Sequence, residues 1–187
     1  METKITVTVT KESDLTPDQQ DEILRLQIAC FADQVTAEEV EEDFVGPSVA
    51  RALAYHRNAL VSCADIMMRS VNYCERTILL GGLSPCTKES FRGQGIGTLV
   101  CQTAMEYLRQ QRCDIAFLSV DTKLVTHPLY DRLGFKMLSQ PFLFANIRGE
   151  IKEADGGMIA PLCSSELFEY VLQGEVPFAL TPERGYW

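Results

Sequence analysis

The spacing of apolar residues defines the elements in the first part of the chain. Apolar and polar residues alternate strictly from Ile5 to Val9, which is the period of a half-buried strand. Thr16-Pro-Asp-Gln19 then offers an N-cap, a proline at the first helical position and a capping-box glutamine, and apolar residues recur at helical spacing up to Phe31. A second capping box at residues 36–39 predicts a short acidic helix that ends near Gly46-Pro47.

Strand-like runs come next. Residues 49–55 and 59–68 flank a tight turn at residues 56–58, and this pattern predicts a hairpin. Residues 74–84 predict a further strand, and we expect Pro85 to stop it because proline cannot donate a hydrogen bond to a sheet.

The second half of the chain alternates between helices and strands. Apolar residues recur at helical spacing from Ile96 to Arg112, and residues 115–120 read as a short, fully buried strand. The further predicted elements are a short helix at 127–134, strands at 135–138 and 158–162, and a short helix at 164–172. This order predicts an α+β (mixed α/β) fold rather than the strict alternation of a doubly wound sheet.

Composition narrows the class of protein. The 187 residues are 46% hydrophobic and show no repeat or linker, so we expect one domain over residues 1–187. A net charge of −9 argues against nucleic acid or a membrane as a partner and suits a cationic one. The scattered cysteines and the lack of an apolar N-terminal segment indicate a cytoplasmic protein with reduced thiols. Neither His56 nor His127 lies at ligand spacing from a cysteine pair, so no metal is expected.

The stretch Phe91-Arg-Gly-Gln-Gly-Ile-Gly97 places glycines where a helix is about to begin. Glycine weakens a helix, but it lets an anion approach the unpaired N–H groups of the first turn, and phosphate suits that position best. A dinucleotide fold is excluded because the loop follows predicted antiparallel strands rather than the first strand of a β-α-β unit. A P-loop is excluded because Thr98, and no lysine, follows Gly97.

Two motifs in this context resemble those of the GCN5-related N-acetyltransferases, the GNAT superfamily. Arg92 to Gly97 matches the R/Q-x-x-G-x-G/A loop of that family, and Leu129 to Phe135 is similar to its (L/A)-Y-x-x-x-G-F signature. The resemblance is firm over residues 49–138 and looser elsewhere. It implies a GNAT fold, in which helices flank a central, mostly antiparallel, splayed sheet, and acetyl-CoA as co-substrate. Family members are often dimers, which allows a homodimer here.

The resemblance assigns roles to individual residues. The loop would cradle the pyrophosphate of coenzyme A, and pantetheine would add like an extra strand between the splayed runs 79–87 and 115–120. Tyr130 matches the tyrosine that protonates the departing thiolate, although an aromatic packed on the sheet is the alternative reading. The cofactor contacts implied in this way are Ser84, Cys86, Thr87, Arg92, Gly93, Gln94, Gly95, Ile96, Gly97 and Thr98.

The ends of the chain are similar to the aminoglycoside 2'-N-acetyltransferases. The segment 30–36, the Asp155-Gly156 pair and the terminal tryptophan carry this likeness, which implies Asp33, Asp155 and Trp187 as substrate contacts. An acidic cluster at residues 38–43 suits a drug with several ammonium groups, or is simply a solvated helix face. Asp121, at the carboxyl end of a strand, is a candidate acid or base or a turn residue.

Two departures from the family pattern affect the chemistry. An ungapped count puts Leu83 where related enzymes carry a glutamate base, and Pro85 lacks an N–H that the strand usually offers to the acetyl carbonyl. Either the strand is bulged and Cys86 or Thr87 supplies the donor, or residues 86–90 are an insertion. A Cys86 nucleophile is disfavoured because no histidine is near in sequence.

The sequence therefore favours acetyl transfer to an aminoglycoside. Two alternatives stay open. One is acetylation of another small amine, a polyamine or a protein N-terminus. The other is a catalytically inactive module that binds coenzyme A, as the two departures suggest. The acyl-chain length of the donor is left open.

Overall fold

The computed structural model describes residues 5–31, 47–121, 127–146 and 148–184. One sheet has the spatial order β1-β2-β3-β4-β5-β9-β6, and among these strands only β4 and β5 pair in parallel. Its strands are β1 (Ile5–Lys11), β2 (Ala50–His56), β3 (Ala59–Tyr73), β4 (Arg76–Thr87), β5 (Ile115–Ser119), β6 (Lys136–Met137) and β9 (Gly157–Pro161). A smaller sheet, β10-β7-β8, contains β7 (Phe142–Ala145), β8 (Ile151–Ala154) and β10 (Phe178–Arg184). The predicted α+β fold with a mostly antiparallel sheet is confirmed.

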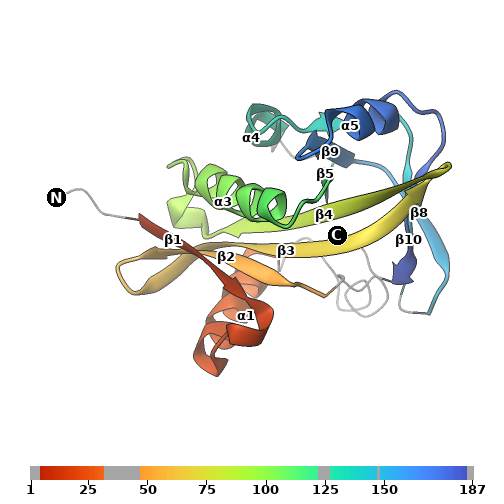
Figure 1. Cartoon of the computed structure of the whole chain (residues 1–187). Coiled ribbons are helices and arrows are strands. Elements are labelled where there is room, and N and C mark those ends of the chain that lie inside the picture. The colour runs from red at the N-terminus through yellow and green to blue at the C-terminus, as the bar shows by residue number, and fades with distance from the viewer. Residues whose placement is uncertain (1–4, 32–46, 122–126, 147, 185–187) are drawn as a thin grey trace.

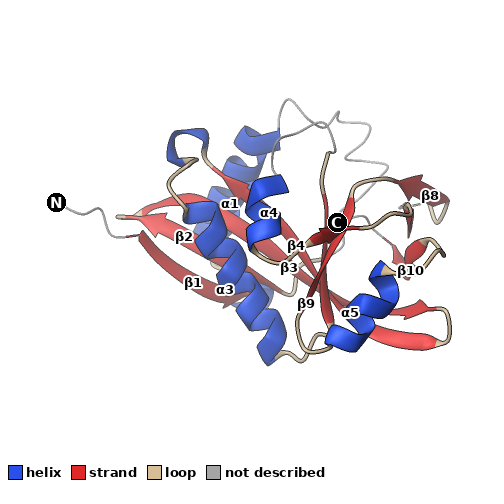
Figure 2. Cartoon of the chain, turned by 90° about the horizontal axis from the view of Figure 1, so that it is seen from above, coloured by secondary structure: helices blue, strands red, loops and turns tan. Residues whose placement is uncertain are grey.

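Helices cover both faces of the large sheet. The α-helices are α1 (Pro17–Phe31), α3 (Ile96–Gln110), α4 (His127–Arg132) and α5 (Ser165–Leu172). In Figure 1, α1 lies below the sheet, whereas α3, α4 and α5 lie above it. Figure 2 shows α3 along the side of the sheet that begins with β1, and α5 beside β9.

Each helix buries one apolar face, as its sequence pattern predicts. Val100 and Leu108 of α3 pack in a core with residues of β2 to β5, and Ile23 of α1 packs against Leu53 and Leu60 on the other face. Burying a side chain of this size stabilises the fold by about 1.5–3 kcal/mol. The predicted capping box also forms, because the Gln19 N–H donates to the Thr16 hydroxyl at 3.3 Å while the Thr16 N–H donates to Gln19 Oε1 at 3.1 Å.

The two parallel strands separate after a short contact. β4 pairs with β5 only from Leu80 to Gly82, opposite Ile115 to Phe117, and then continues to Thr87. Its other edge stays paired with β3 without interruption from Tyr73↔Arg76 to Ser62↔Thr87. In the second half of β4, one edge is therefore paired with β3, and the other edge, the free edge of β4, is no longer paired with β5.

Several predicted boundaries are wrong, each for a local reason. β4 runs through Pro85 in unbroken register, so neither the predicted stop nor the predicted bulge occurs. Cys74 lies in the turn between β3 and β4 with a φ of 53° rather than in a strand, and β3 extends to Tyr73. The short strands β7, β8 and β10 were not predicted, and the predicted helix at 36–46 lies outside the described residues.

Gly81 is required where α3 crosses β4. A Cβ at Gly81 would lie 2.6 Å from Cδ1 of Leu108, which is closer than side-chain atoms can approach. We expect Gly81→Ala to lower the free energy of unfolding by about 1–3 kcal/mol, measured by denaturant titration. In a Leu108→Ala background the same substitution should cost clearly less, and an equal cost in both backgrounds would contradict this contact as its cause.

Candidate active site

The glycine loop leaves the N-terminus of α3 open. Gly93 and Gly95 have φ values of 75° and 79°, a left-handed conformation that favours glycine, and a Cβ at either would meet nothing within 4 Å. Gly95 is the N-cap of α3, and no side chain of the residues described in the structure caps that end. The N–H of Leu99 donates to the Gly95 carbonyl at 3.0 Å, so the N–H groups of residues 96–98 precede the first helical hydrogen bond. These donors form an anion cradle.

The loop is tied to the end of β4. Nε of Arg92 donates to the Thr87 carbonyl at 3.1 Å, and the Gln94 amide donates to the Ser90 carbonyl at 3.1 Å. Gly97 faces the same strand end, since a Cβ there would lie 3.2 Å from Oγ1 of Thr87. The cradle and the free edge of β4 are therefore one continuous feature.

The alternation of the backbone shows which groups of β4 face the free edge. The Lys88 N–H donates to the Val61 carbonyl on β3, whereas the Leu79 N–H donates to Oδ2 of Asp114, just before β5. Even-numbered residues thus direct their N–H and C=O groups toward β3, and odd-numbered ones direct theirs toward the β5 side. Leu83, Pro85 and Thr87 line the free edge, where the N–H donors come from Leu83 and Thr87 and not from Pro85.

Cys86 points away from this edge. Its thiol is buried 3.4 Å from Sγ of Cys63, and its carbonyl accepts a hydrogen bond from the Ser62 hydroxyl at 2.8 Å. The hydrogen bond with Cys30 lowers the pKa of the Cys86 thiol, but the hydrogen bond with Cys63 and burial raise it, and the net pKa is well above its usual value. A protonated, buried thiol suits packing rather than nucleophilic attack.

Tyr130 lies beside the cradle. It belongs to α4, whose Leu129 would be 3.5 Å from a Cβ at Gly97, and its ring packs edge-on against Phe135 at 6.0 Å between centroids. Burial, and to a smaller extent Cys101, raises the pKa of the Tyr130 hydroxyl well above its usual value. The hydroxyl therefore stays protonated at neutral pH and can act as an acid. Both predicted readings, acid and packed aromatic, fit this position.

The candidate acid or base Asp121 and the candidate substrate contact Asp155 lie at the same end of β5 and β9. Asp121 follows the end of β5 and Asp155 precedes β9, and both are exposed. The Val120 N–H donates to the Gly156 carbonyl at 3.0 Å, which joins the two loops. Asp33, Trp187 and the acidic cluster at 38–43 lie outside the described residues.

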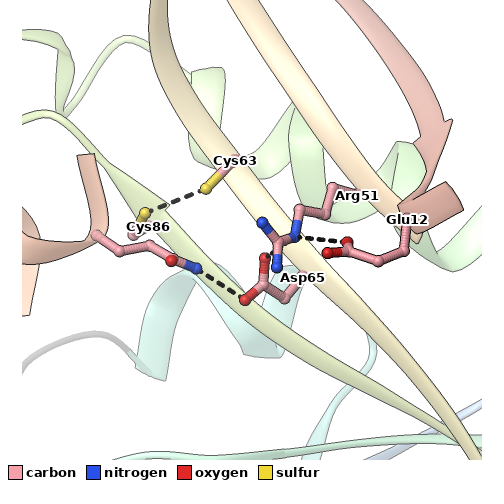
Figure 3. A network of polar contacts seen from close by, with 6 residues as sticks. Glu12, Arg51, Cys63, Asp65 and Cys86 are labelled. Carbon is pink, nitrogen blue, oxygen red and sulfur yellow. Dashed lines mark hydrogen bonds and ion pairs between the residues drawn. The ribbon is translucent and has the colours of Figure 1, made fainter. Parts of the chain in front are cut away.

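A partly buried charged network on the α1 side of the sheet was not predicted. Figure 3 shows Arg51 of β2 between two carboxylates, with its Nε 3.2 Å from Oε2 of Glu12 and 3.0 Å from Oδ1 of Asp65. Gln27 of α1 donates to Oδ2 of Asp65 at 2.7 Å. Burial is the largest influence on Asp65 and raises the pKa of its carboxyl, against the lowering effects of Arg51 and Gln27. An aspartate inside the apolar run 60–68 is the sequence signal that could have revealed it.

Two other classes of feature are absent from the described residues. No three His, Cys, Asp or Glu side chains there are arranged to hold a metal ion. None of the described helices is both long and apolar enough to cross a membrane.

Comparison with known proteins identifies the family. The model of the "Acetyltransferase (GNAT) domain" family matches residues 15–149, more than half of the chain, and the chain belongs to this family. No curated protein matches the sequence at a significant level. The chain is an acetyltransferase of the GNAT type and transfers acetyl to nitrogen, and enzymes of this type take the acetyl group from acetyl-CoA.

Solved structures show the same fold at low sequence identity. Escherichia coli ElaA has a TM-score of 0.60 at 18% identity, covering 84% of this chain and 99% of its own. The E. coli ribosomal-protein-S18-alanine N-acetyltransferase has a TM-score of 0.55 at 12% identity, covering 86% and 96%. A chain of the NatC complex bound to Gag peptide and CoA has a TM-score of 0.56 at 15% identity, covering 83% and 98%. At these identities the likeness shows the fold alone.

The described residues fit coenzyme A. The uncapped helix end and the two glycines without Cβ atoms leave room for a pyrophosphate, and the free edge of β4 offers backbone groups to the pantetheine amides. When bound there, acetyl-CoA supplies the activated acetyl thioester. Gly93 to Thr98 would hold the phosphates, and Leu83 and Thr87 would donate to the pantetheine arm or the acetyl carbonyl.

Gly95 is the residue at which the phosphate cradle can be tested. We expect Gly95→Asp to weaken acetyl-CoA binding at least tenfold, about 1.4 kcal/mol, because a negative side chain would face the pyrophosphate. Isothermal titration calorimetry with CoA measures this. Gly149→Asp is the matched control, because Gly149 also has a positive φ, of 82°, but lies between β7 and β8. Equal affinity of Gly95→Asp and the control would show that the loop does not hold phosphate.

Proposed function

We propose that this enzyme transfers the acetyl group of acetyl-CoA to an amino group of an aminoglycoside, the 2'-amine, by direct transfer in a ternary complex. The observation that carries the proposal is the placement of two exposed aspartates, Asp121 and Asp155, in the two loops that a backbone hydrogen bond joins at one end of β5 and β9. They lie at the carboxyl end of β5, the strand that diverges from β4, and can bind ammonium groups of a polycationic sugar. The net charge of −9 supports the same class of acceptor.

Each group of residues in the site would have a distinct role in the reaction. The cradle binds the cofactor phosphates and fixes the thioester beside the free edge of β4. The N–H of Leu83 or Thr87 stabilises negative charge on the acetyl oxygen, a role for which Pro85 has no donor. Tyr130 gives its proton to the departing sulfur, and the acidic residues orient the amine.

A second acceptor class is favoured by the comparisons. Two of the structures with this fold are an N-acetyltransferase of ribosomal protein S18 alanine and a complex bound to a Gag peptide. A protein or peptide N-terminus, which presents a single reacting ammonium group, is therefore the alternative acceptor.

A product screen distinguishes these acceptors. We expect mass spectrometry, after incubation with acetyl-CoA, to show a gain of one acetyl group on aminoglycosides and none on peptides or polyamines. Fragmentation of the product would place the acetyl group on the 2'-nitrogen. Acetylation of peptides alone would overturn the aminoglycoside assignment in favour of the alternative.

Tyr130 is expected to contribute to turnover and not to the binding of CoA. Tyr130→Phe should lower kcat by about 100-fold or more, the usual contribution of an acid catalyst, and leave the Kd for CoA unchanged. Because the pKa of Tyr130 is raised, the wild-type kcat should show no loss from this group up to about pH 10, the ordinary pKa of tyrosine. Tyr107→Phe in α3 is the control, and similar kinetics for the two variants would remove the acid role.

A further inference from the structure

Ser84 and Asp65 lie side by side on adjacent strands. They are direct partners in the antiparallel register of β3 and β4, and both point to the face of the sheet that carries α1, since Cys63 and Cys86 have the same parity and pack in the α1 core. Directly opposite residues in such a pair have Cβ atoms about 5 Å apart. The hydroxyl and the carboxyl are therefore neighbours on one face of the sheet. They are not hydrogen-bonded to each other here, and catalytic hydrogen bonds often form only once substrates are bound.

Ser84 stands next to the free edge of β4. It lies between Leu83 and Pro85, the residues whose backbone groups face the side from which β5 has departed. Its side chain is half-buried, and no hydrogen bond within the described residues involves its hydroxyl. A group held at the free edge could thus be contacted by the Ser84 hydroxyl from the α1 side.

Asp65 has the character of a proton acceptor. Its side chain is 8% exposed, and its Oδ1 is shielded from water and close to Arg51 without the geometry of a hydrogen bond. The groups that face the carboxyl are Arg51 on β2, Glu12 ahead of α1, the Gln27 amide on α1 and the Cys86 thiol on β4. Two carboxylates share one guanidinium, so the network carries an excess negative charge.

The network is poorly explained as a device for stability. Burial raises the pKa of Asp65, so the folding stability linked to this carboxyl falls as pH rises from the ordinary carboxyl range through the raised value. Replacing a buried ion pair by well-packed apolar residues often leaves stability unchanged or raises it. A carboxylate kept at a cost in stability next to a reaction site is a functional candidate.

We propose that Ser84 and Asp65 form the path that removes the proton from the acceptor amine, with Ser84 in contact with the nitrogen and Asp65 as the final proton acceptor. This inference rests on the proposed transfer of acetyl to an amine. It fills the role left open by Leu83, a buried apolar residue at the position where a glutamate base was expected.

The step balances as follows. The amine nitrogen forms a bond to the acetyl carbon, and the bond from that carbon to sulfur breaks. The proton lost by nitrogen passes to the Ser84 oxygen, whose own proton passes to the Asp65 carboxylate. The sulfur leaves with its electron pair and takes a proton from Tyr130. Asp65 then returns its proton to solvent, and no oxidant or reductant is required.

The pH profile of kcat tests the role of the pair. With an acceptor amine from the product screen, we expect Asp65→Asn and Ser84→Ala each to lose about 100-fold in kcat, and the double variant to lose little more, because the two act as a unit. The wild-type kcat should fall as pH drops through the raised pKa of Asp65, and this acidic limb should vanish in Asp65→Asn.

Glu12→Gln separates catalysis from structure. Glu12 raises the pKa of Asp65, so this variant should keep its turnover at high pH and shift the acidic limb to lower pH. A purely structural network would give Asp65→Asn and Glu12→Gln similar losses of melting temperature with an unchanged pH profile, and that result would overturn the proposal. Circular dichroism confirms that each variant is folded.

A labelling experiment tests the position of Ser84 without an acceptor. In Ser84→Cys, the thiolate should displace bromide from bromoacetyl-CoA, so that the C–Br bond breaks, a C–S bond forms and the protein gains the mass of the –CH2–CO–S–CoA group. Wild type and Ser70→Cys, an exposed position farther along β3, should label at least tenfold more slowly. If all three proteins bind CoA and label at equal rates, the inference about Ser84 is overturned, whereas the proposed function is not. Failure of the wild type to bind CoA would overturn the proposed function.

Discussion

The divergence of β4 from β5 is the constraint on which the site depends. The two strands share a ladder only as far as Gly82, and everything assigned to the chemistry lies along or beside the edge of β4 that follows. Pro85 helps to keep that edge open, because it directs no N–H toward the β5 side and could not complete a ladder there. The continuous pairing with β3 on the other side fixes the register of β4 and therefore which of its backbone groups face the free edge.

Local patterns in the sequence predicted most of the helices and strands but not the contacts between distant ones. The capping box of α1, the hairpin of β2 and β3 and the glycine loop rest on contacts between near neighbours, and their sequences specify them directly. Pro85 was expected to stop its strand because a proline is excluded from the interior of a complete sheet. Here the missing donor faces an edge that has no partner strand among the described residues, so the prediction was wrong for a reason that only the topology reveals.

The candidate site shows the same division between local and distant information. The glycines and Tyr130 could be found because their motifs are compact, whereas the link between Asp65 and Ser84 depends on register between strands about twenty residues apart. The network of Glu12, Arg51 and Asp65 joins three segments, and nothing in the spacing of charges along the chain brings them together. Asp65 inside an apolar strand was the one visible sign, and alone it did not identify a partner.

One measurement tests the central claim, that the free edge of β4 and the N-terminus of α3 together form the acetyl-CoA site. CoA would be titrated into isotopically labelled protein while the backbone amide signals are followed by NMR. The account predicts the largest shifts at Gly93 to Thr98 and at Leu83 and Thr87, with little change in the β7-β8-β10 sheet. Saturable binding that shifts signals elsewhere and leaves the first turn of α3 unchanged would contradict it.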